Sequence, residues 1–209
     1  MSRGWNSRGE VLAGVGRLRR AIMAACAAFA IALWFTSFAG AAAPSLIERL
    51  VAAQKPLQSK QDEPVDPREL ATAIAAVPKI SREWAALILT VAAHESALSA
   101  RIARGDYRDF EGDSFRNREG KVQHRAWGLW QAHRNKLNDA AWGSPDIGVQ
   151  TEEAARALRR AFYTCNGGGH SHADWVRSTL SSYSGRRCDA DWPGLDRRLA
   201  TYQRVLRAL

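Results

Sequence analysis

An acidic residue, Glu95, stands at the end of an apolar stripe. The stripe begins after Ser81 and recurs at helical spacing through Trp84, Leu87, Ile88 and Val91. Glu95 follows four residues after the last of these, on the same helical face. Ionising a carboxyl group beside apolar side chains costs free energy, so we expect Glu95 to hold a proton near neutral pH and to donate it. The pattern predicts a general acid; the alternative is a Glu95 that faces solvent and only ends the helix.

Other arrangements of reactive side chains are incomplete. The pair His94-Glu95 would need a second histidine one turn later to hold zinc as in a protease, but the residue there is Leu98. His170 and His172 supply two ligands beside three glycines, fewer than a zinc site uses. The sequence also lacks a glycine-rich phosphate loop and a serine in a nucleophile elbow. We therefore expect no metal and no cofactor.

The elements that must position Glu95 are mainly helical. Asp66 and Pro67 are a typical helix start, and a second helix begins at Ser81, runs through the Ala97-Leu98 region and ends before Gly105. Further helices are predicted after a Thr151 cap, from Trp175 to near Gly185, and from Leu195 to Leu209.

A polar segment interrupts this helical pattern between Arg104 and Trp127. Its short runs on either side of Glu119-Gly120 predict a small β-hairpin. The fold class we predict is therefore mainly α, with a small β lobe beside a helical core.

The first 66 residues predict export and a tether. Five arginines and one glutamate in residues 1–20 precede an uncharged alanine-rich run over 21–43, which predicts a signal peptide over 1–41, cleaved after Ala41. A retained membrane anchor over 21–43 is the alternative. Residues 42–66 are predicted to be a polar linker, and residues 67–209 the folded domain. We expect a periplasmic or extracellular monomer, or a membrane-anchored one.

The charge excess is moderate. The chain carries 30 basic and 21 acidic residues, and removal of residues 1–41 lowers the formal charge from +9 to +5. Such an excess suits an anionic wall polymer or a membrane surface. Binding of nucleic acid normally requires a concentrated basic stripe with interleaved aromatic residues, which this sequence lacks. The pairs Arg186-Arg187 and Arg197-Arg198 are interpreted as solvated helix faces and ends.

Three cysteines are present, and Cys26 is lost with the predicted signal. In an oxidising compartment we expect Cys165 and Cys188 to pair. Closing that loop would stabilise the fold by about 3 kcal/mol and would fasten two helices. Two free thiols are the alternative.

Three segments carry a resemblance to a known family. They are His94-Glu95-Ser96, then the run from Ala126 to Gln131, then Ser182-Tyr183-Ser184-Gly185. Their order resembles that of the lysozyme-like lytic transglycosylases of the soluble-lytic type, which cleave bacterial peptidoglycan. The resemblance covers the chain from Ser81 to its C-terminus.

The resemblance implies a lysozyme-like α+β fold and a reaction that needs a single acid. Glu95 would protonate the glycosidic oxygen, the N-acetyl group of the substrate would stabilise the cation, and Glu95 would then deprotonate the 6-hydroxyl to form an anhydro ring. The hydroxyl of Tyr183 would orient the Glu95 carboxyl. Substrate contacts would come from Ser96, Gly128, Leu129, Trp130, Gln131 and Tyr183, and the partner would be peptidoglycan glycan strands.

The sequence departs from the family pattern at three places. Trp130 replaces a methionine, Ser184 replaces an asparagine, and 33 positions separate Glu95 from Gly128, which is closer to a lysozyme with an enlarged β-lobe. Chicken-type lysozymes carry a nucleophilic aspartate where this chain has Ala126. The other acids in this region are Asp106, Asp109, Glu111 and Asp113. A hydrolytic muramidase that uses one of them, and a non-catalytic wall-binding protein with the same fold, are the alternative functions.

Overall fold

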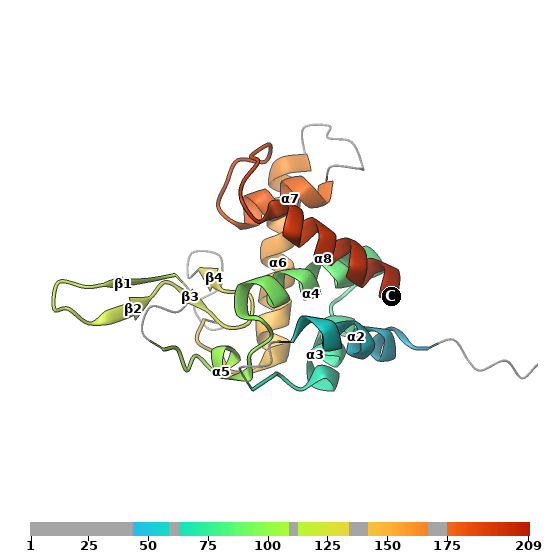
Figure 1. The fold of residues 1–209 in the computed structure, drawn as a ribbon, viewed down its shortest axis with the longest axis horizontal. Helices are drawn as coiled ribbons and strands as arrows, with labels where there is room; N and C mark the ends of the chain where they lie inside the picture. The colour runs from blue at the N-terminus through green and yellow to red at the C-terminus, as the bar shows by residue number, and fades with distance from the viewer. Residues whose placement is uncertain (1–43, 59–62, 109–112, 134–141, 167–174) are drawn as a thin grey trace, which may run out of the picture. The chain divides into compact units, whose positions relative to one another are not determined.

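The computed structural model describes residues 44–58, 63–108, 113–133, 142–166 and 175–209 (Figure 1). The predicted signal peptide, the anchor alternative over 21–43, Asp109, Glu111 and the His170 to His172 segment lie outside the described residues. The folded unit begins at Pro44. Within the described residues it is mainly helical with two small antiparallel sheets, which confirms the predicted fold class.

A helix stands in the predicted linker and corrects that prediction. Helix α2 (Leu46–Gln54) is followed by a 3₁₀ turn, η1 (Lys55–Leu57). Ser45 and Glu48 form a capping box, in which each residue bonds the backbone N–H of the other. Leu50 is fully buried, and α2 packs against helices α3 (Pro67–Ala75) and α8 (Leu195–Ala208). The linker prediction rested on the polar run that follows Gln54, whereas α2 itself carries Leu46, Ile47, Leu50 and Val51 at helical spacing.

Helix α4 (Arg82–Ser96) is the central element of the core and carries Glu95 near its end. Ser81 caps it by accepting a hydrogen bond from the N–H of Trp84. Every residue from Ala85 to Ala92 is buried, as expected of a helix with neighbours on all sides. Helix α8 (Leu195–Ala208), which matches the predicted C-terminal helix, packs along α4 (Figure 1).

Helix α4 ends earlier than predicted. Ala97 and Leu98 have φ angles of 52° and 58°, in the left-handed region, so the helix stops at Ser96. The carbonyl of Leu98 accepts the N–H of Val65, and a separate short helix, α5 (Ala100–Ala103), follows. A tertiary contact with the chain before α3 therefore takes the backbone group that would have continued the helix.

The remaining helices surround α4. Helix α3 (Pro67–Ala75) has the predicted Asp66 cap. Helix α6 (Ile147–Asn166) packs against α3 and against α7 (Trp175–Tyr183). The predicted Thr151 cap is wrong, since the Thr151 hydroxyl donates to the carbonyl of Ile147 inside the helix. Asp146 instead accepts the N–H of Val149 at the helix start.

The predicted hairpin is confirmed. Strands β1 (Ser114–Arg116) and β2 (Val122–His124) are antiparallel, with Phe115 opposite Gln123. The Asn117 side chain accepts two backbone N–H groups in the turn, and the hairpin projects from the helices (Figure 1). A second, unpredicted pair, β3 (Ala126–Trp127) and β4 (Ala132–His133), encloses the turn from Gly128 to Gln131.

None of the described helices combines the length and the hydrophobicity needed to cross a bilayer.

Candidate functional site

Glu95 lines a cleft of about 380 Å³. The walls come from the end of α4, strand β4 with the residue before it, the end of α7, the loop that follows α7, and α8. The lining residues are Glu95, Gln131, Ala132, His133, Tyr183, Ser184, Gly185, Arg186, Trp192 and Arg198. All three sequence segments that carried the resemblance thus contribute to one cleft.

Glu95 is partly shielded from water and paired with an arginine. Its side chain is 21% exposed, and Oε1 accepts a hydrogen bond from Nη1 of Arg198 at 2.6 Å. Arg198 is 13% exposed and comes from α8. A guanidinium this close stabilises the charged carboxylate, an influence that the apolar stripe alone did not indicate. The expectation that Glu95 holds a proton in apolar surroundings therefore leaves out its nearest charged neighbour.

Tyr183 lies in the floor of the cleft. It is 5% exposed, and its hydroxyl donates to the main-chain carbonyl of Trp130 at 2.8 Å. Burial raises the pKa of Tyr183, and the Glu95 carboxylate adds to this effect. The phenol therefore stays neutral. The Tyr183 hydroxyl proton is thus directed to Trp130, whereas the resemblance implied that this hydroxyl orients the Glu95 carboxyl.

Gln131 is the member of the second motif that reaches the cleft. It is 9% exposed, and its Nε2 donates to the carbonyl of Gly128 at 2.9 Å and to the hydroxyl of Tyr107 at 3.1 Å. Its Oε1 is buried without a hydrogen-bond partner among the described residues. Buried polar atoms of this kind are uncommon in folded proteins. Because this oxygen is shielded from solvent, a donor from a ligand in the cleft would reach it only after neighbouring side chains shift.

The rest of that motif builds the turn. Gly128 has a φ of +70°, and a Cβ there would lie 2.2 Å from Oε1 of Gln150. That same oxygen accepts the N–H of Leu129 at 2.9 Å. The glycine therefore permits the close approach of Gln150, and its contact with the saccharide stays a prediction.

Two predicted substrate contacts lie in the core instead. Leu129 is fully buried, and Trp130 is 1% exposed with its indole N–H donating to the carbonyl of Ile88. Trp127 is half-buried and lies beside Tyr107 and Trp142. An aromatic residue next to a glycine turn has the same sequence pattern whether it packs in the core or lines a binding groove. The sequence alone therefore could not distinguish these two positions.

The serines of the motifs differ in position. Ser96 is buried, and its hydroxyl donates to the carbonyl of Ala92, which corrects its predicted substrate contact. Ser184 lines the cleft, and its Oγ is buried without a partner among the described residues. The Ser184 hydroxyl would reach a ligand in the cleft only after a change of its side-chain rotamer.

A cationic cluster that the sequence analysis missed forms another wall. The guanidinium carbons of Arg186 and Arg198 each lie 5.1 Å from the centre of the Trp192 ring. Arg186-Arg187 and Arg197-Arg198 had been interpreted as solvated pairs. The overlooked signal is that Arg198 stands three residues after Leu195 and four before Tyr202, on the buried face of α8.

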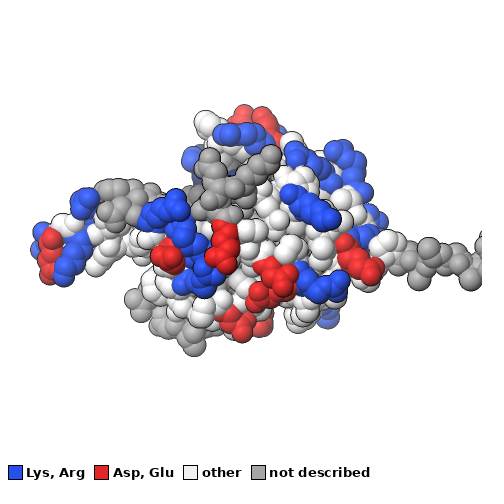
Figure 2. All heavy atoms as spheres, turned by 60° about the horizontal axis from the view of Figure 1, so that its bottom comes forward, with Lys and Arg blue, Asp and Glu red and all other residues white. Residues whose placement is uncertain are grey.

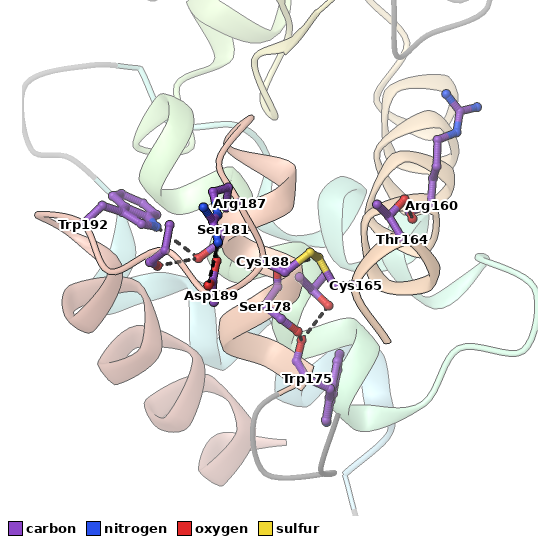
Figure 3. The surroundings of a disulfide bond; sticks show 12 residues. Arg160, Thr164, Cys165, Trp175, Ser178, Ser181, Arg187, Cys188, Asp189 and Trp192 are labelled. Atoms are coloured by element: carbon purple, nitrogen blue, oxygen red, sulfur yellow. Dashed lines mark hydrogen bonds and ion pairs between the residues drawn. A yellow bond between two sulfur atoms is a disulfide. The ribbon is translucent and has the colours of Figure 1, made fainter. Parts of the chain in front are cut away.

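The disulfide and two hydrogen bonds fasten the loop that carries this cluster (Figure 3). Cys165 and Cys188 are bonded, with Cα atoms 5.5 Å apart, which confirms the predicted pairing. The bond joins α6 to the loop after α7 rather than two helices. In the same loop the Trp192 indole N–H donates to Oγ of Ser181, which in turn donates to the carbonyl of Ala190. The wall of the cleft is thus anchored at three points.

Of the acids before Ala126 that the structure describes, Asp113 is connected to the cleft. Its carboxylate lies 3.4 Å from Nε2 of His133, which lines the cleft. Asp106 is exposed. No group of three or more His, Cys, Asp and Glu side chains among the described residues is arranged to hold a metal ion.

Charges of both signs share the surface. On the face shown in Figure 2, groups of Lys and Arg side chains alternate with groups of Asp and Glu. Several are paired, as Arg104 is with Glu63 at 3.0 Å.

No protein-family model matches this chain, and neither a curated protein nor a solved structure shows significant similarity to it.

Proposed function

We propose that this chain is a lysozyme-like lytic transglycosylase that cleaves peptidoglycan glycan strands, with Glu95 as general acid and then base. The observation that carries the proposal is the convergence of three separate segments on one cleft. Glu95, Gln131 and the run from Tyr183 to Gly185 are far apart in the sequence and line the same cavity. Their types suit a saccharide, because a carboxyl, an amide and a hydroxyl side chain line one cleft.

In the proposed reaction Glu95 first gives a proton and then takes one back. The Glu95 carboxyl gives its proton to the glycosidic oxygen while the bond from that oxygen to C1 of the N-acetylmuramic acid residue breaks. The carbonyl oxygen of the sugar's own N-acetyl group stabilises the positive charge at C1. The Glu95 carboxylate then takes the proton of the 6-hydroxyl, whose oxygen bonds to C1. Glu95 ends the cycle protonated, and the product carries a 1,6-anhydro ring.

Two side chains would orient the sugar. The free Oε1 of Gln131 is an acceptor suited to the N–H of an N-acetyl group. The free hydroxyl of Ser184 both donates and accepts, which suits a sugar hydroxyl. Tyr183 would keep the floor of the cleft in place through its bond to Trp130.

Export remains part of the proposal. A signal over residues 1–41 would place the enzyme in the periplasm or outside the cell, where peptidoglycan is accessible. The Cys165–Cys188 bond supports an oxidising compartment. A retained anchor over 21–43 is the alternative.

Hydrolysis is the second candidate reaction. The contact of Asp113 with His133 favours it, because a carboxylate-bound histidine at the edge of the cleft can position a water molecule. A muramidase would leave reducing ends instead of anhydro ends. A wall-binding protein would leave the strands intact.

Mass spectrometry of peptidoglycan digested by the purified exported protein separates these functions. We expect anhydro ends from the wild type and a loss of at least a hundredfold in rate for Glu95→Gln. Glu69→Gln, on the exposed first turn of α3, is the matched control and should cleave normally. Reducing ends would favour the muramidase, and an absence of new ends would leave the wall-binding function.

A further inference from the structure

The cleft holds more positive than negative charge. Arg186 and Arg198 lie against the same indole ring, and Glu95 is the one carboxylate among the lining residues that the structure describes. Arg198 is paired with Glu95, whereas Arg186 is exposed and has no carboxylate partner among the described residues. Trp192 stabilises both cations through its negative ring faces, but it does not neutralise them. An anionic group that enters the cleft is therefore attracted.

The ion pair also presents a problem for the proposed reaction. The guanidinium of Arg198 occupies Oε1 of Glu95, so Glu95 must lose this partner before that oxygen can act on a glycosidic bond. The pair is only partly buried, and a second anion at the cluster can compete for Arg198. When a second carboxylate lies beside Glu95, two adjacent negative charges are unfavourable, and one carboxyl then takes up a proton.

We propose that the Arg186–Trp192–Arg198 cluster binds a free carboxylate carried by the glycan next to the scissile bond, and that this binding draws Arg198 away from Glu95, which then takes up a proton from solvent. This inference rests on the proposed function and specifies its substrate: strands whose sugars carry a free carboxylate, in preference to neutral N-acetylated oligosaccharides. Arg186 and Arg198 act as positioning and specificity residues, and Glu95 remains the catalytic residue.

Calorimetric titration tests the preference directly. The probe is a non-cleavable disaccharide that contains N-acetylmuramic acid, with its lactyl group as the free carboxylate or as the carboxamide. We expect the wild type to bind the carboxylate form about tenfold more tightly. Arg186→Gln should reduce this preference to about threefold or less. Arg187→Gln is the matched control, because Arg187 is exposed, lies outside the cleft lining and bonds to Asp189.

Proton uptake supplies the second measurement. Titration in two buffers of different ionisation enthalpy gives the number of protons bound with the ligand. We expect uptake approaching one proton with the carboxylate form in the wild type, and none in Glu95→Gln. Equal affinity for the two forms, or binding of the carboxylate without uptake of a proton, would overturn the inference.

The two proposals fail differently. A carboxylate preference with proton uptake in a protein that cleaves no glycan would support the cluster and refute the enzyme. Formation of anhydro ends by a protein that binds the two disaccharides equally would support the enzyme and refute the cluster.

Discussion

Glu95 at the end of α4 and Arg198 on α8 meet at 2.6 Å, although 103 residues separate them in the chain. The contact joins the helix that carries the proposed acid to the helix that closes the chain. Both side chains are largely shielded from water. Removal of either charge therefore leaves the remaining charge poorly solvated and without its partner, which is unfavourable.

Removal of the two charges should therefore be non-additive. We expect Glu95→Gln and Arg198→Gln each to lower the free energy of unfolding, with a coupling energy of about 1–2 kcal/mol in the double-mutant cycle. Urea unfolding of the four proteins measures it. The exposed pair Arg104 and Glu63 is the reference cycle and should couple by less than about 0.5 kcal/mol. Equal coupling in the two cycles would contradict the special position of Glu95.

Two glycines with similar backbone angles should respond differently to alanine. Gly128 and Gly120 have φ angles of +70° and +78°, so the backbone strain is similar, about 1 kcal/mol. A Cβ at position 128 would lie 2.2 Å from Oε1 of Gln150, whereas at position 120 it meets nothing within 4 Å. We expect Gly128→Ala to cost about 3 kcal/mol and Gly120→Ala about 1 kcal/mol. Similar urea midpoints for the two variants would show that Gln150 moves aside freely.

Loss of the disulfide should weaken the fold and the cleft together. Replacing Cys165 and Cys188 by serine removes the constraint on a loop of 23 residues, and we expect about 2–4 kcal/mol less stability. The same variant should lose activity on glycan strands, because the loop bearing Arg186 and Trp192 has lost one attachment. Denaturation with and without a thiol reductant is the measurement. The reductant should lower the denaturation midpoint of the wild type and leave that of the double-serine variant unchanged. A wild-type midpoint that does not respond to the reductant would contradict the prediction.

His94 should make stability depend on pH. His94 is exposed on one side, and partial desolvation of its ring lowers its pKa from 6.5; the positive charges of Arg198, Arg197 and Arg204 add to this effect. The unfolded state therefore binds more protons than the folded state between the lowered pKa and 6.5. The stability contributed by neutral His94 is complete above that window and is lost as the pH falls through it.

The measurement is Tm against pH for the wild type and His94→Gln. The glutamine preserves a polar group near Thr201, whose hydroxyl lies 2.9 Å from the histidine ring. We expect the fall in Tm between about pH 7 and pH 5 to be smaller in the variant. Parallel curves would show that His94 does not carry the effect.

The elements that sequence reasoning located are those with local signals. Asp66 and Pro67 mark the start of α3, and the apolar spacing from Leu195 onward marks α8. The disulfide was predictable because only two cysteines, Cys165 and Cys188, remain after the predicted cleavage, which leaves one possible pairing. Each of these depends on residues close in sequence or on a pairing with few choices.

Most of the positions that were not predicted depend on tertiary contacts. Helix α2 is the exception, because its capping box of Ser45 and Glu48 is a local signal in the sequence. The end of α4 depends on a backbone bond to Val65, and the environment of Glu95 depends on Arg198. No local pattern indicates a partner a hundred residues away, so Glu95 was found without its counter-charge.

The bond between Cys165 and Cys188 ties the assembly of one cleft wall to the redox state of the surroundings. A newly made chain in a reducing cytosol keeps both thiols and lacks that attachment, so its wall is held by noncovalent contacts, among them those through Ser181. Under the proposed function, a cell would thus be making a murein-degrading enzyme whose cleft is completed only after it has left the compartment where it was synthesised.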